Sequence, residues 1–226
     1  MTYVVSDIHG EYELFLGLLE KINFTPCDTI YICGDIIDKG NNSIKLLQYI
    51  SDMPNAKCII GNHEYAFLKY YWALMRECND DFESVLQRLN AYFGGENEKL
   101  TWEIIDWLEA LPFYIEEKDF ICVHAGVPLN ENGNILPLEI AMPEELLYDR
   151  KFKEPSVLPK GEKCVFFGHT PTCYITNENK ILTYCKEGKK GDKVSDYHKV
   201  HLDMGTWITG MIGAFCIESC ETIYVK

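Results

Sequence analysis

The sequence predicts an α/β fold in which parallel strands alternate with helices. Near the start of the chain, a strand, a polar loop and a helical pattern follow one another three times, with strands at residues 3–5, 29–33 and 57–60. Consecutive units of this kind form parallel strands joined by right-handed crossovers. Ligand sites of such sheets lie at the carboxyl ends of the strands. The polar loops stand at those ends and are therefore the candidate functional segments.

The helices of the first two units are predicted by the spacing of their apolar side chains. After the first strand, leucine and isoleucine recur on one helical face, at Leu14, Leu18, Leu19 and Ile22. After the second strand, Ser43 can cap a helix. The apolar face of that helix carries Ile44, Leu47 and Ile50.

The rest of the chain is predicted to be helical first and then rich in strands. From about residue 65 to 111 the apolar spacing is helical around a break at Gly94–Gly95, and we expect this stretch to cover or flank the sheet. Strands are then expected at residues 120–123, 164–167, 200–202 and 214–225. The polar stretch 186–193 predicts a solvated hairpin loop. No linker or repeat interrupts the chain, which predicts a single domain over residues 1–226.

The composition favours a soluble globular protein. The chain has 226 residues, of which 47% are hydrophobic, enough for a sizeable buried core. Its formal net charge of -14 repels the phosphate backbone of nucleic acids and anionic membrane surfaces. No apolar run is long enough to span a bilayer, and no signal-peptide pattern begins the chain. We therefore expect a cytoplasmic protein with no nucleic-acid or membrane partner.

The ten cysteines predict small buried side chains in a reducing compartment. No Cys-x-x-Cys pair occurs, and five cysteines lie within short apolar runs: Cys33, Cys58, Cys122, Cys164 and Cys216. A zinc site at Cys216 and Cys220 is the sharper alternative, but the segment around them has no paired knuckle.

Polar side chains that can bind a metal through oxygen or imidazole nitrogen stand at the ends of five predicted strands. They are Asp7 with His9, Asp35 with Asp38, Asn62 with His63, His124, and His169. Oxygen and imidazole ligands without sulfur suit Mn²⁺, Fe or Zn²⁺. A single histidine on an apolar strand is more often a core residue, but four of the six histidines occupy such strand ends. This coincidence predicts a metal site.

Five short motifs carry a family resemblance. They are Asp7-Ile8-His9-Gly10, Gly34-Asp35-Ile36-Ile37-Asp38-Lys39-Gly40, Gly61-Asn62-His63-Glu64, His124-Ala125-Gly126 and Gly168-His169-Thr170. The chain resembles the calcineurin-like metallophosphoesterases, and among them the phosphoprotein phosphatases of the short bacterial and phage Ser/Thr type. The resemblance spans residues 1 to about 210. It implies an αββα sandwich of two mixed β-sheets flanked by helices, with a dinuclear metal centre at the edge of the sheets.

The resemblance also implies a role for each site residue. Asp7 and His9 would bind the first metal, Asp35 would bridge both metals, and the second metal would be held by Asn62, His124 and His169. His63 would be the catalytic acid, oriented by Asp38. Arg150 would bind phosphate, and the alternative for it is a surface ion pair with Asp149 or a neighbouring acid. Lys39 would also bind phosphate, but it stands where the family usually has Arg and lacks the planar fork of donors. Two divalent cations are expected, Mn²⁺ first, with Fe or Zn²⁺ as alternatives.

Three further residues near these motifs have no assigned chemistry. We expect Glu64 to support its turn or to cap the following helix. His198 and His201 face opposite sides of a strand, so at most one can point to the site. We expect His198 to be structural and leave the role of His201 open. For Ile60, which stands where many relatives carry Arg, the sequence suggests no mechanistic role.

Three functions are open at this point. The first is hydrolysis of phosphoserine, phosphothreonine and also phosphotyrosine in proteins, by a hydroxide shared between two cations and a proton from His63. The second is hydrolysis of a dinucleoside polyphosphate such as diadenosine tetraphosphate at the same site. The motif around Asp38 and the glutamate of Gly-Asn-His-Glu favour the first. A noncatalytic scaffold is the third, although such a protein would be expected to have lost metal ligands.

Overall fold

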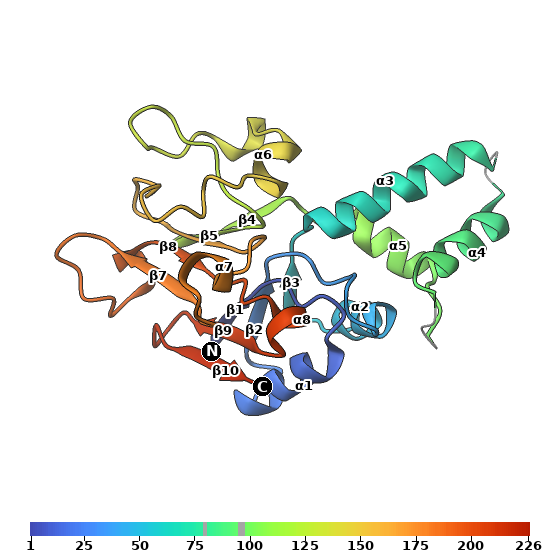
Figure 1. Ribbon diagram of the computed structural model, residues 1–226, viewed down its shortest axis with the longest axis horizontal. Helices are drawn as coiled ribbons and strands as arrows, with labels where there is room; N and C mark the ends of the chain where they lie inside the picture. The colour runs from blue at the N-terminus through green and yellow to red at the C-terminus, as the bar shows by residue number, and fades with distance from the viewer. Residues whose placement is uncertain (79–80, 95–97) are drawn as a thin grey trace.

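The computed structural model describes residues 1–78, 81–94 and 98–226. Two five-stranded mixed sheets lie face to face, and helices pack against their outer sides (Figure 1). This arrangement confirms the predicted αββα sandwich. No helix within the described ranges is long and apolar enough to cross a membrane.

The first sheet contains the three parallel strands that the sequence predicts. Its strand order is β10-β9-β1-β2-β3. The strands are β1 (Thr2–Val5), β2 (Thr29–Ile32), β3 (Ala56–Cys58), β9 (Ile212–Cys216) and β10 (Thr222–Val225). β1, β2 and β3 are parallel, whereas β9 and β10 add antiparallel strands beside β1. The crossover helices α1 (Tyr12–Lys21) and α2 (Ser43–Ser51) bury their apolar faces in the cluster on the outer side of this sheet.

The second sheet repeats the parallel arrangement and closes it with two antiparallel edges. Its strand order is β4-β5-β6-β8-β7, in which β5, β6 and β8 are parallel. The strands are β4 (Tyr114–Glu116), β5 (Phe120–Val123), β6 (Cys164–Phe167), β7 (Leu182–Cys185) and β8 (Tyr197–His201). The sequence does not predict β4 and β7, because these three- and four-residue edge strands bury few side chains and show little apolar patterning. The predicted polar loop at 186–193 joins the antiparallel pair β7 and β8.

The central strands of both sheets, such as β5 and β6, are buried on two sides, because each sheet also has a covered outer face. Between the sheets, Val4 and Tyr31 pack with Phe120, Phe166 and Phe215. The outer face of the second sheet is covered chiefly by a loop segment with the short helices η1 (Leu138–Ile140) and α6 (Pro143–Leu147). All ten cysteines are free, and Cys33, Cys58, Cys122, Cys164 and Cys216 are buried as predicted.

The predicted helical stretch forms a group that extends to one side of the sheets (Figure 1). It consists of α3 (Asn62–Glu77), α4 (Phe82–Tyr92) and α5 (Trp102–Glu109), whose apolar faces join the cluster behind the first sheet. Gly95 of the predicted break lies outside the described residues. The remaining short helices are α7 (Cys173–Thr176), η2 (Val194–Asp196) and α8 (Thr206–Thr209).

Candidate metal centre

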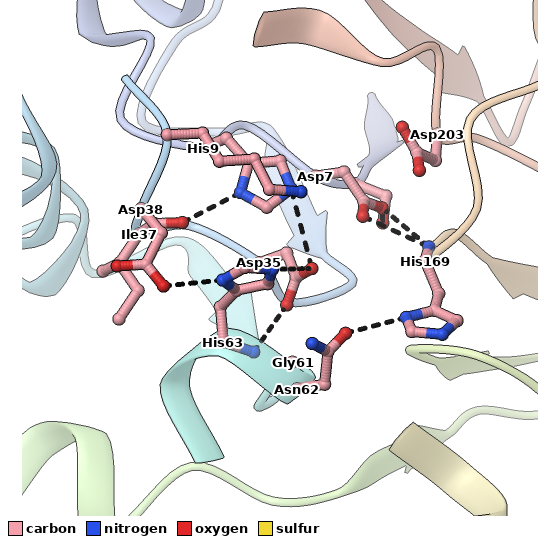
Figure 2. A network of polar contacts seen from close by, with 12 residues as sticks. Asp7, His9, Asp35, Ile37, Asp38, Gly61, Asn62, His63, His169 and Asp203 are labelled. Atoms are coloured by element: carbon pink, nitrogen blue, oxygen red, sulfur yellow. Dashed lines mark hydrogen bonds and ion pairs between the residues drawn. The ribbon is translucent and has the colours of Figure 1, made fainter. Parts of the chain in front are cut away.

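The loops that follow five parallel strands meet at one edge of the sandwich. Asp7 and His9 follow β1, Asp35 follows β2, and Asn62 begins the helix after β3. From the second sheet, His124 follows β5 and His169 follows β6. Figure 2 shows Asp35 between His9 and His63 on one side and Asn62 and His169 on the other. The structure therefore brings together all six side chains that the resemblance assigns to metal binding.

The backbone of these loops adopts an uncommon conformation. Asp7, His9, Asp35 and His169 have φ angles of 52°, 51°, 54° and 72°, in the left-handed region that non-glycine residues rarely occupy. Such conformations cost about 1–3 kcal/mol each and cluster at functional sites. A Cβ atom at Gly168 would collide with the Asp7 carboxylate, so this position requires glycine. The backbone is thus bent so that the polar side chains converge.

One group of ligand atoms comes from loops of both sheets, and its atoms lie close together. The Oδ1 atom of Asn62 lies 2.9 Å from His124 Nε2 and 2.7 Å from His169 Nδ1. Asp35 Oδ1 lies 3.4 Å from His124 Nε2. Ligands held about 2.0–2.2 Å from one cation stand about 3 Å apart. The spacing of these atoms therefore fits a bound divalent cation.

A second group of ligand atoms shares Asp35 with the first. Asp35 Oδ2 lies 3.6 Å from His9 Nε2 and 3.9 Å from His63 Nε2. By distance alone, two groups of described residues could each hold a metal ion. One is His9, Asp35 and His63, the other is Asp35, His124 and His169, and Asp35 belongs to both. The resemblance assigns Asp7 in place of His63 to the first set. His63 instead holds its Nδ1 atom 2.6 Å from Asp38 Oδ2.

The protein by itself disfavours the ionised form of the buried carboxylates of the site. Burial raises the pKa of Asp7 well above its usual range, and the nearby charges of Asp203 and Asp35 raise it further. Burial and the charge of Glu64 raise the pKa of Asp35 to about 8. A divalent cation reverses such shifts because it stabilises the ionised carboxylate. The buried carboxylates therefore also fit a cationic group.

The four histidines of the site divide into two electrostatic classes. Burial lowers the pKa of His9 to about 3, that of His169 to about 4 and that of His124 well below its usual range, and the charges of Lys39 and Arg150 reinforce the shifts of His9 and His169, respectively. These three rings are therefore neutral, as metal ligands must be. Burial also acts to lower the pKa of His63, but the hydrogen bond to Asp38 and the charge of Asp35 outweigh it and raise the pKa. Only His63 favours the protonated form, which suits a general acid.

Comparison with known proteins agrees with this geometry. The pattern of the calcineurin-like phosphoesterases matches residues 2–197, which include every motif of the site. The chain belongs to this family. Its resemblance to the calcineurin-like metallophosphoesterases is therefore confirmed.

The curated and solved relatives of this phosphoesterase carry two kinds of name. A symmetrical bis(5'-nucleosyl)-tetraphosphatase from Aggregatibacter actinomycetemcomitans is 32% identical over 130 residues, which cover 56% of this chain and 44% of the relative. The chain thus spans less than half the length of the curated relatives it matches.

A crystal structure of a putative diadenosine tetraphosphatase has a TM-score of 0.70 at 19% identity, and the match covers 99% of this chain and 92% of that structure. A cold-active protein tyrosine phosphatase has a TM-score of 0.57 at 12% identity and covers 100% of this chain and 78% of its own. These two structures show the fold alone.

Glu64 organises the loop that carries Asp35 in this phosphoesterase. Its fully buried carboxylate accepts hydrogen bonds from the backbone N–H groups of Asp35, Ile36 and Ile37, at 2.9, 2.8 and 3.0 Å. It also accepts one from Gly61 at 2.8 Å, at the start of α3. The prediction that Glu64 supports its turn or caps the following helix is confirmed by the bond from Gly61, and its bonds to the Asp35 loop go beyond that prediction.

Asp203 is a site residue that the sequence reasoning missed. It follows β8 at the same edge, is 2% exposed and lies beside Asp7 (Figure 2). Burial raises its pKa to about 7, although the N–H group of Gly205, at 2.7 Å from its Oδ1 atom, opposes the shift. A signal was available, because an aspartate just after the predicted strand at 200–202 with a nearby glycine repeats the pattern of the other motifs.

Of the two predicted phosphate-binding side chains, Lys39 contacts the metal centre and Arg150 acts on it through its charge. Lys39 Nζ is 3.4 Å from His9 Nε2 and 4.9 Å from the ring centre of Trp207. Arg150 is exposed, and its charge contributes to the lowered pKa of His169. Within the described residues it forms no ion pair with a carboxylate, so the alternative of a surface ion pair with Asp149 finds no support.

The last two histidines lie outside the metal centre. His198 Nδ1 is 2.8 Å from the carbonyl oxygen of Pro159, in agreement with the predicted structural role. His201 is fully buried, and its ring stacks on Phe167 with 4.3 Å between the ring centres. Burial lowers the pKa of His201 to about 3, so the ring is neutral. It belongs to neither group of metal-binding side chains found in the described part of the chain.

Proposed function

We propose that this phosphoesterase is a dinuclear metal hydrolase that cleaves bis(5'-nucleosyl) tetraphosphates. The observation that carries the mechanism is the contact of His63 Nδ1 with Asp38 Oδ2 at 2.6 Å, which raises the pKa of His63. Burial instead lowers the pKa of the other three histidines of the site, His9, His124 and His169. Asp7, His9 and Asp35 would hold one cation, and Asp35, Asn62, His124 and His169 the other. Bound there, two divalent cations supply the Lewis acidity that makes water nucleophilic near neutral pH.

The side chains of the protein then have separate tasks in the reaction. Water adds across a P–O–P bond: one phosphorus gains the oxygen of water, and the bridging oxygen leaves with the other half of the substrate. His63 donates its Nε2 proton to that leaving oxygen, and Asp38 holds the ring by its Nδ1 atom, 2.6 Å away. Lys39 and Arg150 contribute positive charge to the phosphoryl oxygens, where negative charge must be stabilised.

The names of the curated relatives support a dinucleotide as the substrate. These relatives share 29–32% identity with about half of this chain and are named symmetrical bis(5'-nucleosyl)-tetraphosphatases. Exposed aromatic rings lie at both ends of the metal centre, and such rings can stack on bases. Trp207, 43% exposed, lies beyond Lys39, and Tyr148, 37% exposed, has its ring centre 6.4 Å from that of His169. These relatives favour the second sequence-based hypothesis over the phosphoprotein one.

Phosphoserine and phosphothreonine remain a second candidate substrate class. The observation that favours them is the pair formed by Asp38 and His63. A serine or threonine alkoxide is a poor leaving group and must receive a proton, whereas a nucleoside diphosphate leaves more readily. A strong proton donor is therefore of greater value to a phosphoprotein phosphatase.

A comparison of rates tests the proposal. Diadenosine tetraphosphate and a panel of phosphoserine and phosphothreonine peptides are incubated with the purified chain and Mn²⁺, and products are separated by ion-exchange chromatography. We expect a higher kcat/KM for the dinucleotide, with two nucleoside diphosphates as products of cleavage at the central anhydride. A clear preference for the peptides would replace the proposal with the second candidate.

Two histidine variants provide the matched control. His63→Asn should lower kcat by a factor within the 10²–10⁴ range of general acid catalysis, nearer its lower end for the dinucleotide. His198→Asn removes a histidine bonded to Pro159, outside the metal centre, and should leave kcat unchanged. A strong chelator should abolish activity, and undiminished turnover in its presence would contradict the metal mechanism.

A further inference from the structure

A tyrosine of the helical group reaches the pair that orients the proposed acid. The hydroxyl of Tyr92, the last residue of α4, lies 3.2 Å from both Oδ1 and Oδ2 of Asp38. Asp38 in turn contacts His63 at 2.6 Å. A continuous line of polar contacts therefore runs from α4 through Asp38 to the ring that would donate the proton.

The ring of Tyr92 is held in place by aromatic neighbours. Its centre lies 5.5 Å from that of Phe67 on α3 and 5.0 Å from that of Phe93, and both of these side chains are buried. His63 lies in the first turn of the same helix as Phe67. The packing between α3 and α4 therefore sets the distance between the Tyr92 hydroxyl and the dyad of Asp38 and His63.

The hydroxyl acts as a donor to the Asp38 carboxylate. Burial and the charge of Asp38 raise the pKa of Tyr92 to about 12, so the hydroxyl keeps its proton at any pH at which the enzyme would work. A donor shared between both carboxylate oxygens restricts rotation of the carboxylate plane. An Asp38 carboxylate held in this way keeps a proton on Nδ1 of His63, in either the neutral or the doubly protonated ring. It also orients the Nε2 atom of the same ring.

We propose that Tyr92 is a positioning residue that orients the Asp38–His63 pair for proton donation. The inference rests on the proposed role of His63 as general acid and adds a third member, supplied by the helical group. Tyr92 does not touch the reacting atoms. A cavity of about 280 Å³ is lined by Asp38, Lys39, Ser43 and Tyr92, among others, so water can replace a lost hydroxyl. The loss of the Tyr92 hydroxyl should therefore weaken proton donation without unfolding the site.

A variant pair isolates the hydroxyl. Tyr92→Phe removes it and keeps the ring, whereas Tyr70→Phe removes a hydroxyl from a ring whose centre is 5.9 Å away on the same helical group. The first measurement is ¹⁵N-edited NMR of the His63 imidazole with Zn²⁺ as the added cation. We expect Tyr92→Phe to shift the Nδ1–H signal and to make its exchange with water several-fold faster, and Tyr70→Phe to match the wild-type protein. An unchanged signal in Tyr92→Phe would overturn the proposal.

The second measurement compares leaving groups. Phenyl phosphate requires a proton on its leaving oxygen, whereas p-nitrophenolate leaves without one. Tyr92→Phe should lower kcat for phenyl phosphate about tenfold, a fraction of the 10²–10⁴ that general acid catalysis supplies, with KM unchanged and with less than about a twofold loss for p-nitrophenyl phosphate. A merely structural role would lower both rates equally, and that result would also overturn the proposal.

His63→Asn separates this inference from the proposed function. If His63→Asn lowers kcat equally for both aryl phosphates, His63 is not the general acid, and the proposed role of Tyr92 is then wrong as well. If His63→Asn shows the leaving-group dependence and Tyr92→Phe does not, only the role of Tyr92 is wrong. If neither aryl phosphate is turned over, the NMR result decides the role of Tyr92.

Discussion

Two loops that each carry a basic side chain to the metal centre are held in different ways. The loop after β2 ends in Asp38 and Lys39, and three of its backbone N–H groups donate to Glu64. In the loop after α6, which carries Arg150, the N–H groups of Lys151 and Phe152 donate to Asp149 of the same loop. Its backbone is also held from the second sheet by Lys199, whose ammonium donates to the carbonyl oxygens of Phe152 and, at 2.8 Å, Glu154.

The first loop is held by a residue of a recognisable sequence motif, whereas the second is held by a residue that only the tertiary structure brings near. Glu64, which holds the loop after β2, belongs to another of the five sequence motifs, so both the loop and its partner can be recognised in the sequence. Lys199 is fully buried and lies among three aromatic rings, those of Phe152, Phe167 and Tyr184. Nothing near Lys199 in the sequence relates it to Arg150. Changes in the first loop should therefore remove catalysis, whereas changes in the second should weaken stability and phosphate binding.

The largest effect is expected where both groups of ligand atoms share one carboxylate. Asp35→Asn keeps the shape of the side chain but removes its charge, so both proposed cations lose a ligand. We expect activity to fall on the order of 10³-fold or more, since Lewis-acid stabilisation supplies several kcal/mol and each 1.36 kcal/mol is a factor of ten. Bound metal per chain, measured by mass spectrometry after dialysis, should fall in parallel.

The same substitution should raise the stability of the metal-free protein. Burial and the charge of Glu64 disfavour the ionised form of Asp35, and asparagine has no charge to desolvate. Urea unfolding in a chelator should show the gain, and Asp52→Asn, at an exposed position, should change neither stability nor activity. Full metal content in Asp35→Asn would show that Asp35 is not a ligand.

A smaller effect is expected from the residue that holds the first loop. Glu64→Gln replaces two carboxylate oxygens with one carbonyl oxygen. Some of the four backbone N–H groups that donate to Glu64 therefore lose their acceptor. Each unsatisfied buried donor costs about 1–3 kcal/mol, and we expect a loss of about 3 kcal/mol in the free energy of unfolding. Activity should fall too, because the displaced loop carries Asp35 and Asp38.

Urea titration of Glu64→Gln beside Glu20→Gln measures this effect. Glu20 is exposed on α1, so its substitution should leave the midpoint unchanged. Equal midpoints for the two variants would mean that the backbone of the loop after β2 holds its shape without Glu64.

The sequence predicts the parallel strands and the metal ligands for a shared physical reason. Apolar runs such as residues 29–33 are long enough to identify a buried strand, and the residue after such a run must lie at the sheet edge. Contacts between segments far apart in the chain leave no such pattern. The hydroxyl of Tyr92 on Asp38 and the ammonium of Lys199 under the Arg150 loop depend on packing that only the folded chain reveals. The edge strands β4 and β7 were missed because half-exposed strands need no apolar pattern.

The smallest effect is expected at the anchor of the second loop. Lys199→Met keeps an unbranched apolar stem among the aromatic rings but leaves the carbonyl oxygens of Phe152 and Glu154 without their donor. At pH 9.5, where deprotonation of Lys199 relieves most of the cost of its buried charge, we expect a loss of about 1–3 kcal/mol in the free energy of unfolding. With its loop less restrained, Arg150 should hold the substrate less well, which should raise KM for the phosphorylated substrate more than it lowers kcat. Lys193→Met, at an exposed position of the loop before β8, is the matched control.

The pH dependence of stability identifies Lys199 as the source of this effect. Burial lowers the pKa of Lys199 from 10.5 to about 8, so between these pH values the unfolded chain binds more protons than the folded chain. The free energy of unfolding contributed by this group therefore rises with pH across that window, and below about pH 8 the cost of the buried charge is fully present. In urea titrations at pH 7.5, 8.5 and 9.5, the wild-type protein and Lys193→Met should therefore gain stability with pH relative to Lys199→Met. The same slope in all three proteins would mean that Lys199 is not buried as an ammonium, and the second loop would then need another anchor.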